Sequence, residues 1–336
     1  MNRFKIGFFS VLIIIGFVFL SFQVWAAEHA KVNVRIISAP FGTMTYVLGS
    51  ALEDISKKHH PWLRFNHSES PGYVYNMKKI GKEPEVRKDL IIGTGPVLNY
   101  LAKKGLPPFD QKYEGVKLLA VFALNARWLG TLNPDIKTIK DLEGKKIALG
   151  RKPQINFAFN PDAILRDGWG IKDKIKIQYL GTKPAIAALM DGLVDAAIVG
   201  GYINPAGKYF QPGPPTLELI ASGKKVFHIP WGDEQVKKTI AMGLPIIPFK
   251  VPAGTLKGLD SDLSVFANTL TWCASSEFPE ELAYEFVKLN IENVSKFKEY
   301  HSLGKLVSKE LFSYGWDEKD IHPGAIKAFK EFRLLN

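Results

Sequence analysis

The chain has 336 residues, of which 46% are hydrophobic and 23% are charged, and it carries a formal net charge of +11. This length allows two domains with separate cores, and the composition excludes a disordered chain and a protein with many membrane spans. The single cysteine, Cys273, excludes a disulfide within the chain.

The first residues have the composition of a secretory signal peptide. Arg3 and Lys5 form a positive start, residues 6–22 are apolar without a charge, and Val24-Trp25-Ala26 supplies the residues that a signal peptidase reads. The sequence therefore predicts a signal peptide over residues 1–26 that is cleaved on export to the periplasm. The alternative is an uncleaved membrane anchor, because the uncharged run is long for a signal peptide.

The charge balance favours a negatively charged partner. Without Arg3 and Lys5 the chain keeps 42 basic and 33 acidic side chains, a net charge of +9. Such a balance is compatible with nucleic acid, an acidic membrane surface or an anionic small molecule. The lysines occur in scattered pairs, export argues against nucleic acid, and no recognition motif for nucleic acid is present. We therefore expect a small organic anion as partner, and no nucleic acid.

The first hundred residues after the signal peptide repeat the order strand, turn and helix. Strands are predicted at 32–36, 62–66 and 90–92, because apolar residues there alternate with polar ones or form short buried runs. Helices are predicted after the first strand, at 47–58, and after the third, at 97–104. This order is typical of a parallel sheet covered by helices.

The pattern of the first lobe returns about a hundred residues later. After a strand predicted at 117–124, the chain again alternates strands and helices. Asp89, a short apolar strand and Gly93 have a counterpart in Asp195, a short apolar strand and Gly200. Two similar α/β lobes would show this pattern, with the glycine turns at the carboxyl ends of their strands. Open α/β sheets bind ligands at those ends.

The last third of the sequence begins with a predicted loop at 211–216, QPGPPT. The apolar segments 225–229 and 243–252 are expected to carry the chain back toward the first lobe. A buried strand is predicted at 264–274, and amphipathic helices from Pro279 onward.

Motifs for catalysis are not found in the sequence. The GTG at 93–95 lacks the third glycine of a dinucleotide fingerprint, no serine lies in a G-x-S-x-G turn, and no glycine loop ends in Lys-Ser or Lys-Thr. The adjacent His59 and His60 have no further ligands at metal-site spacing. We therefore expect no enzyme activity, no metal and no cofactor.

Four segments together resemble the TAXI family of solute receptors of TRAP transporters. They are IKDLEGKKIALG (139–150), ALMDGLVDAAIVGG (188–201), ESPGYVYN (69–76) and DIHPGAIKAFKEF (320–332). The first two are shared by many two-lobed binding proteins, whereas the order and spacing of all four make the match specific. The resemblance covers nearly the whole mature chain.

The resemblance implies an α/β, two-lobed periplasmic-binding-protein type II fold. Each lobe would be a mainly parallel sheet flanked by helices, and crossing strands would join the lobes. Lobe I would comprise residues 27–124 and 251–336, and lobe II residues 125–250. Closure on a solute would occur about the strands near 122–128 and 245–251.

The implied function is capture of a solute in the cleft and its delivery to TRAP membrane permease subunits by a monomeric protein. Two alternatives remain open. The chain could serve an ATP-driven importer, or it could be a periplasmic ligand sensor or enzyme on the same fold.

The sequence departs from the family where the solute would lie. Aromatic residues stand where the family has small or acidic ones, at Phe41, Tyr73, Tyr75 and Phe157. Aromatic walls leave a second charged end of a solute unsatisfied, which is costly when buried. We therefore expect an organic carboxylate with an apolar or aromatic body, in preference to a small amino acid or dicarboxylate.

The candidate solute contacts follow strand ends or precede helices. Guanidinium groups bind carboxylates through two parallel hydrogen bonds, and helix starts favour anions. The alternative for each residue is structural: a helix cap, a core position or a surface salt bridge. The candidates are Thr43, Thr45, Tyr46, Tyr73, Thr94, Arg127, Arg151, Asn156, Phe157, Tyr202 and Asn204.

Overall fold

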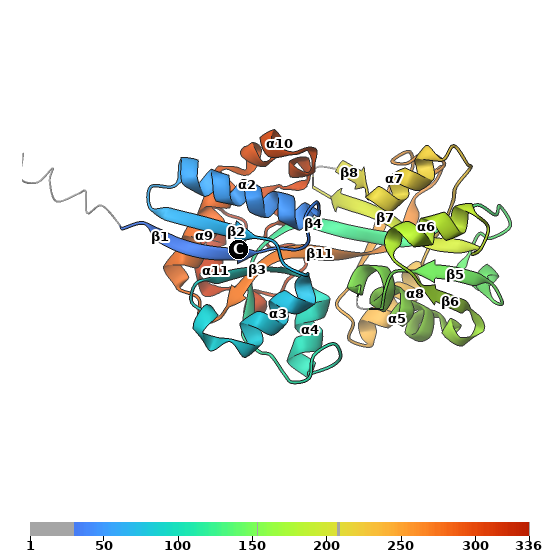
Figure 1. Cartoon of the computed structure of the whole chain (residues 1–336), viewed down its shortest axis with the longest axis horizontal. Helices are drawn as coiled ribbons and strands as arrows, with labels where there is room; N and C mark the ends of the chain where they lie inside the picture. Colours follow the sequence, from blue (N-terminus) through green and yellow to red (C-terminus); the bar gives the residue numbers. More distant parts are fainter. Residues whose placement is uncertain (1–29, 153, 207–208, 336) are drawn as a thin grey trace, which may run out of the picture.

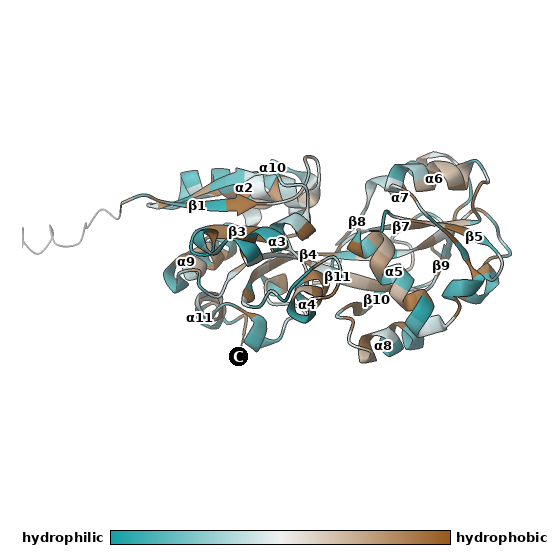
Figure 2. Cartoon of the chain, turned by 60° about the horizontal axis from the view of Figure 1, so that its bottom comes forward, coloured by the Kyte–Doolittle hydropathy of each residue, from teal (hydrophilic) through white to brown (hydrophobic). Residues whose placement is uncertain are grey.

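Two α/β lobes lie side by side in the computed structural model, which describes residues 30–152, 154–206 and 209–335 (Figure 1). Within these residues, no helix is both long and apolar enough to cross a membrane. The signal peptide predicted at 1–26 lies outside the described residues. In Figure 2 the hydrophobic residues gather on the central strands, and the outer helices carry most of the hydrophilic ones.

The first lobe is built on three parallel strands, with β1 in the middle. The strands are β1 (Val32–Ile37), β2 (Leu63–Ser68) and β3 (Leu90–Thr94). The helices that follow them are α2 (Met44–His59), α3 (Tyr73–Lys82) and α4 (Pro96–Lys104). The predicted threefold order of strand, turn and helix is therefore confirmed.

The ends of these helices are fixed by local chemistry. Thr43 caps α2, since its hydroxyl accepts a hydrogen bond from the Tyr46 backbone N–H. Pro96 begins α4, where a missing N–H costs nothing, and Gly105 ends it at a φ of 65°. Both signals were readable in the sequence.

Two long antiparallel strands, β4 (Val116–Thr131) and β11 (Leu263–Ser275), belong to both lobes. One part of β11 pairs with β3, and one part of β4 pairs with β7 (Ala196–Asn204) of the second lobe. The single sheet that results runs in the order β2-β1-β3-β11-β4-β7-β5-β6. The lobe limits given above stay a prediction.

The return of the chain differs from the sequence-based expectation. The segment near 245–251 was expected to cross between the lobes. Instead β10 (Ile247–Val251) pairs with the first five residues of β11, and β11 makes the crossing. Both segments are apolar and strand-like, so their periodicity does not distinguish an edge strand from a crossing one.

The second lobe repeats the parallel arrangement with β5 (Lys146–Leu149), β6 (Lys176–Tyr179) and β7. Two short strands run antiparallel at its edges, β8 (Tyr209–Pro212) on β7 and β9 (Phe227–Ile229) on β4. Its helices are α5 (Asn160–Ala163), α6 (Thr182–Met190), α7 (Pro214–Ala221) and α8 (Asp233–Ala241).

The prediction of a loop at 211–216 is wrong. These residues form the end of β8 and the start of α7, with Pro214 at the first helical position. Proline is well suited to that position because its fixed φ matches the helix. The cluster of prolines therefore marked a helix start rather than an irregular connection.

After β11 the chain stays in the first lobe. It forms α9 (Glu280–Glu292), α10 (Phe297–Tyr300) and α11 (Pro323–Glu331), and α11 packs on α9 (Figure 1). His322 caps α11: its ring Nδ1 accepts from the Gly324 N–H, and its backbone N–H donates to Leu118 O at 2.9 Å. His322 therefore ties the C-terminal segment to β4.

We expect the protein to lose stability as the pH falls below about 6.5, the ordinary histidine pKa. His322 is fully buried, and burial lowers its pKa. Between that lowered pKa and 6.5, the unfolded chain binds a proton that the folded chain excludes, so acid favours unfolding. Urea unfolding at pH 7.5 and 5.5 measures the loss.

A His322→Asn variant retains a helix cap without the titrating ring. We expect this variant to lose less stability than the wild type between the two pH values. The same loss in both proteins would contradict a role for His322 in the acid sensitivity. His67 and His228, whose pKa values burial also lowers, account for the remainder.

Candidate functional site

A cavity of about 540 Å³ opens between the two lobes. The first lobe contributes the turn after β1 and the start of α3, and the second lobe contributes the segment after β5. The crossing strands contribute Asn125 and Leu270, and β7 contributes Tyr202. The cavity therefore lies where the carboxyl ends of parallel strands from both lobes meet, the usual binding place in open α/β sheets.

The floor of this cleft is one face of the sheet at the crossing point. Asn125 of β4 lies opposite Asn268 of β11 on one side and Tyr202 of β7 on the other. Residues that pair directly across strands share a face, and so do residues two apart along a strand. Arg127 therefore lies on the same face as Asn125, one step further into the second lobe.

Arg127 is a buried cation beneath the wall of the cleft, with 2% of its surface exposed. Its Nη1 donates to Ala126 O at 2.7 Å and to Gly201 O at 3.0 Å. The guanidinium carbon lies 4.3 Å from the centroid of the Phe157 ring and 5.7 Å from that of Tyr202. Both rings line the cleft, so they separate Arg127 from the cavity by one layer of side chains.

No carboxylate in the described part of the chain neutralises Arg127. Its Nε has no hydrogen-bond partner there, and the one side chain that raises its pKa, by charge and by a hydrogen bond, is the phenol of Tyr202. Burial lowers the pKa of the guanidinium to about 10, which still leaves it charged at neutral pH. A buried charge without a counter-ion is costly, so this position is poised to receive an anion.

Gly200 makes room for Arg127 on the neighbouring strand. A Cβ atom at Gly200 would lie 2.8 Å from Arg127 Cδ and 2.1 Å from Ala126 O, and the residue has a φ of 153°. No side chain fits there without moving the strand or the arginine. Gly200, which the sequence analysis places in a turn at the end of a strand, instead lies inside β7, where the site requires a glycine.

Asparagine side chains link the second lobe to the crossing strand. Asn156 Oδ1 accepts hydrogen bonds from Asn160 Nδ2 and from Asn268 Nδ2, both at 3.1 Å. Asn156 follows β5, whereas Asn268 belongs to β11. The cleft segment of the second lobe is thus held against the floor by carboxamide groups.

On the first-lobe side, the hydroxyls of Tyr73 and Thr45 share a hydrogen bond. Tyr73 begins α3 and its ring packs on Gly93, where an added Cβ would lie 3.2 Å from it. Burial raises the pKa of Tyr73, so its hydroxyl stays protonated at neutral pH. Both side chains line the cleft and can bind a polar group of a solute.

Six of the eleven candidate contacts line the cavity: Thr43, Thr45, Tyr73, Asn156, Phe157 and Tyr202. Arg127 lies behind two of them. The structure therefore brings together residues from both lobes that the sequence alone could only place at strand ends. Their contact with a solute stays a prediction.

The other four candidates lie away from the cavity lining. Tyr46 packs between the Phe41 and His67 rings, at centroid distances of 5.0 and 4.9 Å. Thr94 is fully buried in β3, and Asn204 is 1% exposed at the end of β7. Arg151 is exposed, and its backbone N–H donates to Gln154 Oε1.

Several cleft residues were not anticipated from the sequence. The strand at 117–124 was taken to end at Leu124, but β4 continues to Thr131, and Asn125 thus lies on the floor. A polar Asn125 inside an apolar strand was the available signal. Of the four aromatic residues expected where the solute would lie, Tyr73, Tyr75 and Phe157 line the cavity, whereas Phe41 is exposed and does not. The further unanticipated lining residues are Ala39, Pro40, Met44, Pro71, Gly72, Val74, Leu98, Gln154, Ile155 and Leu270.

Comparison with known protein families gives one match, which spans most of the sequence. Residues 36–332 match the sequence profile described as the NMT1-like family. The chain belongs to the NMT1-like family. No curated protein matches the chain. The match is broader than the TAXI family that the sequence motifs resemble.

Several solved structures share the fold of this NMT1-like chain. A TctC solute-binding protein from Polaromonas is 14% identical and has a TM-score of 0.52, with 92% of this chain and 98% of that chain covered. A putative sulfonate ABC transporter protein, the periplasmic sulfonate-binding protein SsuA from Methylobacillus flagellatus, is also 14% identical, with a TM-score of 0.53 and coverages of 90% and 96%. XAC2383 from Xanthomonas citri, bound to ATP, is 8% identical, with a TM-score of 0.51 and coverages of 90% and 98%.

At these identities the comparisons establish the fold alone. They confirm the predicted two-lobed α/β fold of periplasmic solute-binding proteins.

Proposed function

We propose that this NMT1-like protein is an extracytoplasmic solute-binding protein that captures an organic anion, in particular a carboxylate, in the cleft between its lobes. The observation that carries the proposal is Arg127, a buried cation behind the aromatic wall of the cleft, with no carboxylate partner among the described residues. A solute anion would supply the missing charge. In a site shielded from water, such a charge-assisted contact is stronger than at the surface.

The aromatic wall sets how the anion would reach Arg127. Phe157 and Tyr202 each lie on the guanidinium and line the cavity. A rotation of either ring would open a path to Nε, which has no partner, without a change in the backbone. The Tyr202 hydroxyl could then donate to the same anionic group.

The rest of the lining favours a solute with an apolar body. Among the residues that the structure describes, no lysine, arginine, aspartate or glutamate lines the cavity, whereas Met44, Val74, Leu98, Ile155 and Leu270 do. A second charged group on the solute would therefore have no counter-ion among the described lining residues. We propose a carboxylate with an apolar or aromatic body, and not a short dicarboxylate.

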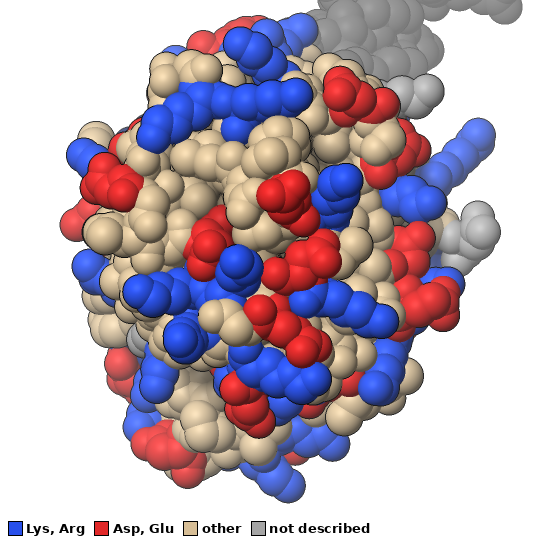
Figure 3. Space-filling model, turned by 90° about the vertical axis from the view of Figure 1, so that its right-hand side faces the viewer, with Lys and Arg blue, Asp and Glu red and all other residues tan. Residues whose placement is uncertain are grey.

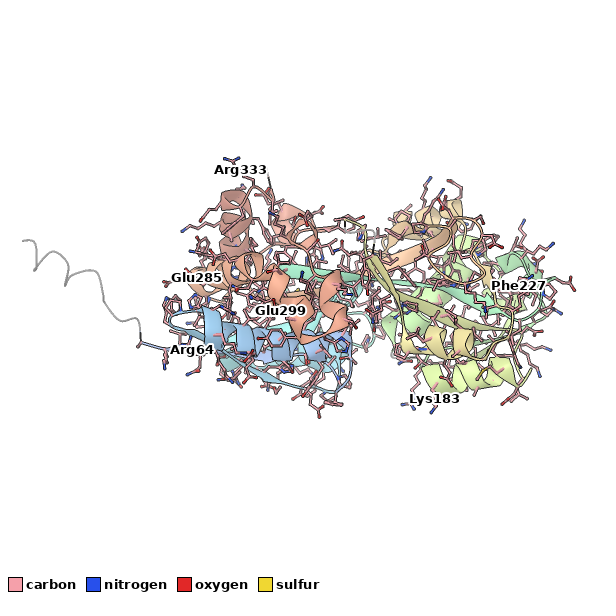
Figure 4. The ribbon with its side chains drawn as sticks, turned by 90° about the horizontal axis from the view of Figure 1, so that it is seen from above. Arg64, Lys183, Phe227, Glu285, Glu299 and Arg333 are labelled. Carbon is pink, nitrogen blue, oxygen red and sulfur yellow. The ribbon has the colours of Figure 1, made fainter. Side chains whose placement is uncertain are left out.

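The surface charges support a small-molecule partner rather than a polyanion. On the end of the second lobe, lysines and arginines alternate with aspartates and glutamates and form no continuous positive patch (Figure 3). In Figure 4, Phe227 lies at the outer end of the second lobe, whereas Lys183 lies at one edge of the second lobe and Arg333 at one edge of the first. On the face that Figure 3 shows, the positive charge is dispersed.

The membrane partner we propose is a TRAP-type permease, on the resemblance of the four sequence segments to TAXI receptors. An ATP-driven importer is the second candidate, because one similar structure is a putative sulfonate ABC transporter protein. Uptake by the neighbouring transporter in energised vesicles separates them. Dependence on an ion gradient without ATP supports the first, and dependence on ATP supports the second.

A thermal-shift panel tests the solute class directly. It should contain amino acids, short dicarboxylates, aromatic acids, fatty acids and neutral sugars, each at millimolar concentration. We expect the largest rise in melting temperature with monocarboxylates that have an apolar or aromatic body. Stabilisation by glutamate, succinate or a sugar alone would contradict the proposal.

Binding should also close the lobes about β4 and β11. Small-angle scattering with the ligand found in the panel should give a smaller radius of gyration than without it. An unchanged radius at saturation would argue against closure.

A further inference from the structure

Four asparagines form one connected group at the floor of the cleft, here called the amide cluster: Asn125, Asn156, Asn160 and Asn268. Asn156 bonds to Asn160 and to Asn268, and Asn268 lies opposite Asn125 across the two crossing strands. Asn125 and Asn156 line the cleft. Asn268 lines a small adjoining cavity of about 20 Å³, room for about one water molecule or one small substituent.

The amide cluster has three acceptor atoms without donors. The Oδ1 atoms of Asn125, Asn160 and Asn268 are buried and have no hydrogen-bond partner within the described part of the chain, and the residues are 5%, 0% and 2% exposed. Buried polar groups in folded proteins are nearly always hydrogen-bonded. Asn125 lines the cleft and Asn268 lines the adjoining cavity, so their unpaired carboxamide oxygens indicate that a donor is brought in from outside.

The position of the cluster relative to Arg127 limits where that donor lies on the solute. Asn125 and Arg127 are two residues apart on one face of β4, a spacing of about 7 Å along a strand. A solute whose acid group is held at Arg127 would thus place a substituent near its acid end against the cluster. The apolar lining would receive the remainder of the solute.

The charge of Arg127 favours a hydroxyl over an ammonium group as the hydrogen-bond donor of the solute. An ammonium group would lie within about 7 Å of the buried Arg127 cation, and no carboxylate among the described residues lines the cavity to offset the repulsion. A hydroxyl donates a hydrogen bond without adding charge, and it can also accept one from a carboxamide Nδ2.

We infer that the amide cluster is a specificity subsite for a hydroxyl group, so that the protein selects hydroxy acids with an apolar body over the corresponding deoxy acids and amino acids. This inference rests on the proposed function, since it assumes that Arg127 holds the acid group. Removing a hydroxyl that meets a buried acceptor typically lowers affinity by tenfold or more.

Matched ligands test the inference on the unmodified protein by isothermal titration calorimetry. The ligands have three carbon skeletons: propionate, hexanoate and 3-phenylpropionate. Each skeleton is tested as the plain acid, the 2-hydroxy acid, the 3-hydroxy acid and the 2-amino acid. We expect one hydroxy acid to bind at least tenfold more tightly than its plain acid, and the amino acid to bind more weakly than both.

Two variants test whether the preference for a hydroxyl group depends on the amide cluster. Asn125→Leu and Asn268→Leu should each reduce the hydroxyl preference from at least tenfold to less than threefold. Asn99→Leu is the matched control, because Asn99 is also buried with an unpaired Oδ1 but lies outside the cleft. It should keep the full preference. Circular dichroism checks that each variant folds. If a variant does not fold, the comparison of ligands on the wild-type protein alone decides the inference.

The outcomes separate the two proposals. Plain acids that bind with no gain from a hydroxyl overturn the hydroxyl subsite and leave the proposed function standing. Tighter binding of the amino acids also overturns it. If no acid of any skeleton binds, the proposed function fails, and the subsite fails with it.

Discussion

Replacing Arg127 by methionine should weaken binding of the anionic solute by at least a hundredfold, yet leave the solute-free protein as stable as the wild type or more so. Removing one partner of a buried charge pair typically costs about 2–5 kcal/mol of binding. An apolar side chain of similar length, however, relieves the free protein of a buried cation that has no counter-ion. Calorimetric titration and urea unfolding measure the two effects separately.

Arg166→Met is the matched control for this prediction. Arg166 also lies in the second lobe, but it is exposed and paired with Asp167. It should change neither affinity nor stability by more than about 0.5 kcal/mol. A loss of both binding and stability in Arg127→Met would show that Arg127 holds the fold rather than the solute.

Replacing Gly200 by alanine should destabilise the protein by about 2–5 kcal/mol and abolish binding of the anion by the folded fraction. The new Cβ would meet a backbone oxygen at 2.1 Å and the Arg127 side chain at 2.8 Å, at a φ of 153°. Both the strand and the guanidinium must then shift. Thermal unfolding gives the first effect, and titration with the panel ligand at low temperature gives the second.

Gly144→Ala is the control that separates the steric clash expected at Gly200 from the backbone strain of a positive φ. Gly144 has a φ of 79° in the second lobe, and nothing lies within 4 Å of an added Cβ. It should cost only the left-handed backbone penalty, about 1–2 kcal/mol, without loss of binding. If Gly200→Ala behaves in the same way, Gly200 is not needed to accommodate Arg127.

The order of strands and helices was predictable because local signals coincide with tertiary packing. Short apolar runs, Pro96 and Gly105 mark elements whose ends depend on nearby residues alone. The repeated acidic residue before each strand has a structural use in both lobes. Asp89 binds Arg35, and Asp195 Oδ2 accepts from the Lys146 N–H, so each acid fixes a neighbouring strand.

The crossing of β11 between the lobes and the extension of β4 beyond Leu124 could not be predicted in the same way. They depend on which apolar segments pair over long sequence separations, and periodicity carries no such information. Asn125 was missed for this reason, because its position on the floor follows from its pairing with Asn268 and Tyr202. Thr94, predicted as a solute contact that follows a strand, is the fully buried last residue of β3 and is not part of the cavity lining.

The most direct test of the account is to identify the compound that the protein carries. Protein purified without refolding from its own host would be denatured, and the released small molecules would be compared by mass spectrometry with those from Arg127→Met. We expect one organic acid with an apolar or aromatic body, close to one molecule per chain, in the wild type and little of it in the variant. A neutral or cationic compound, or the same acid in equal amounts from both proteins, would contradict a cleft built around Arg127.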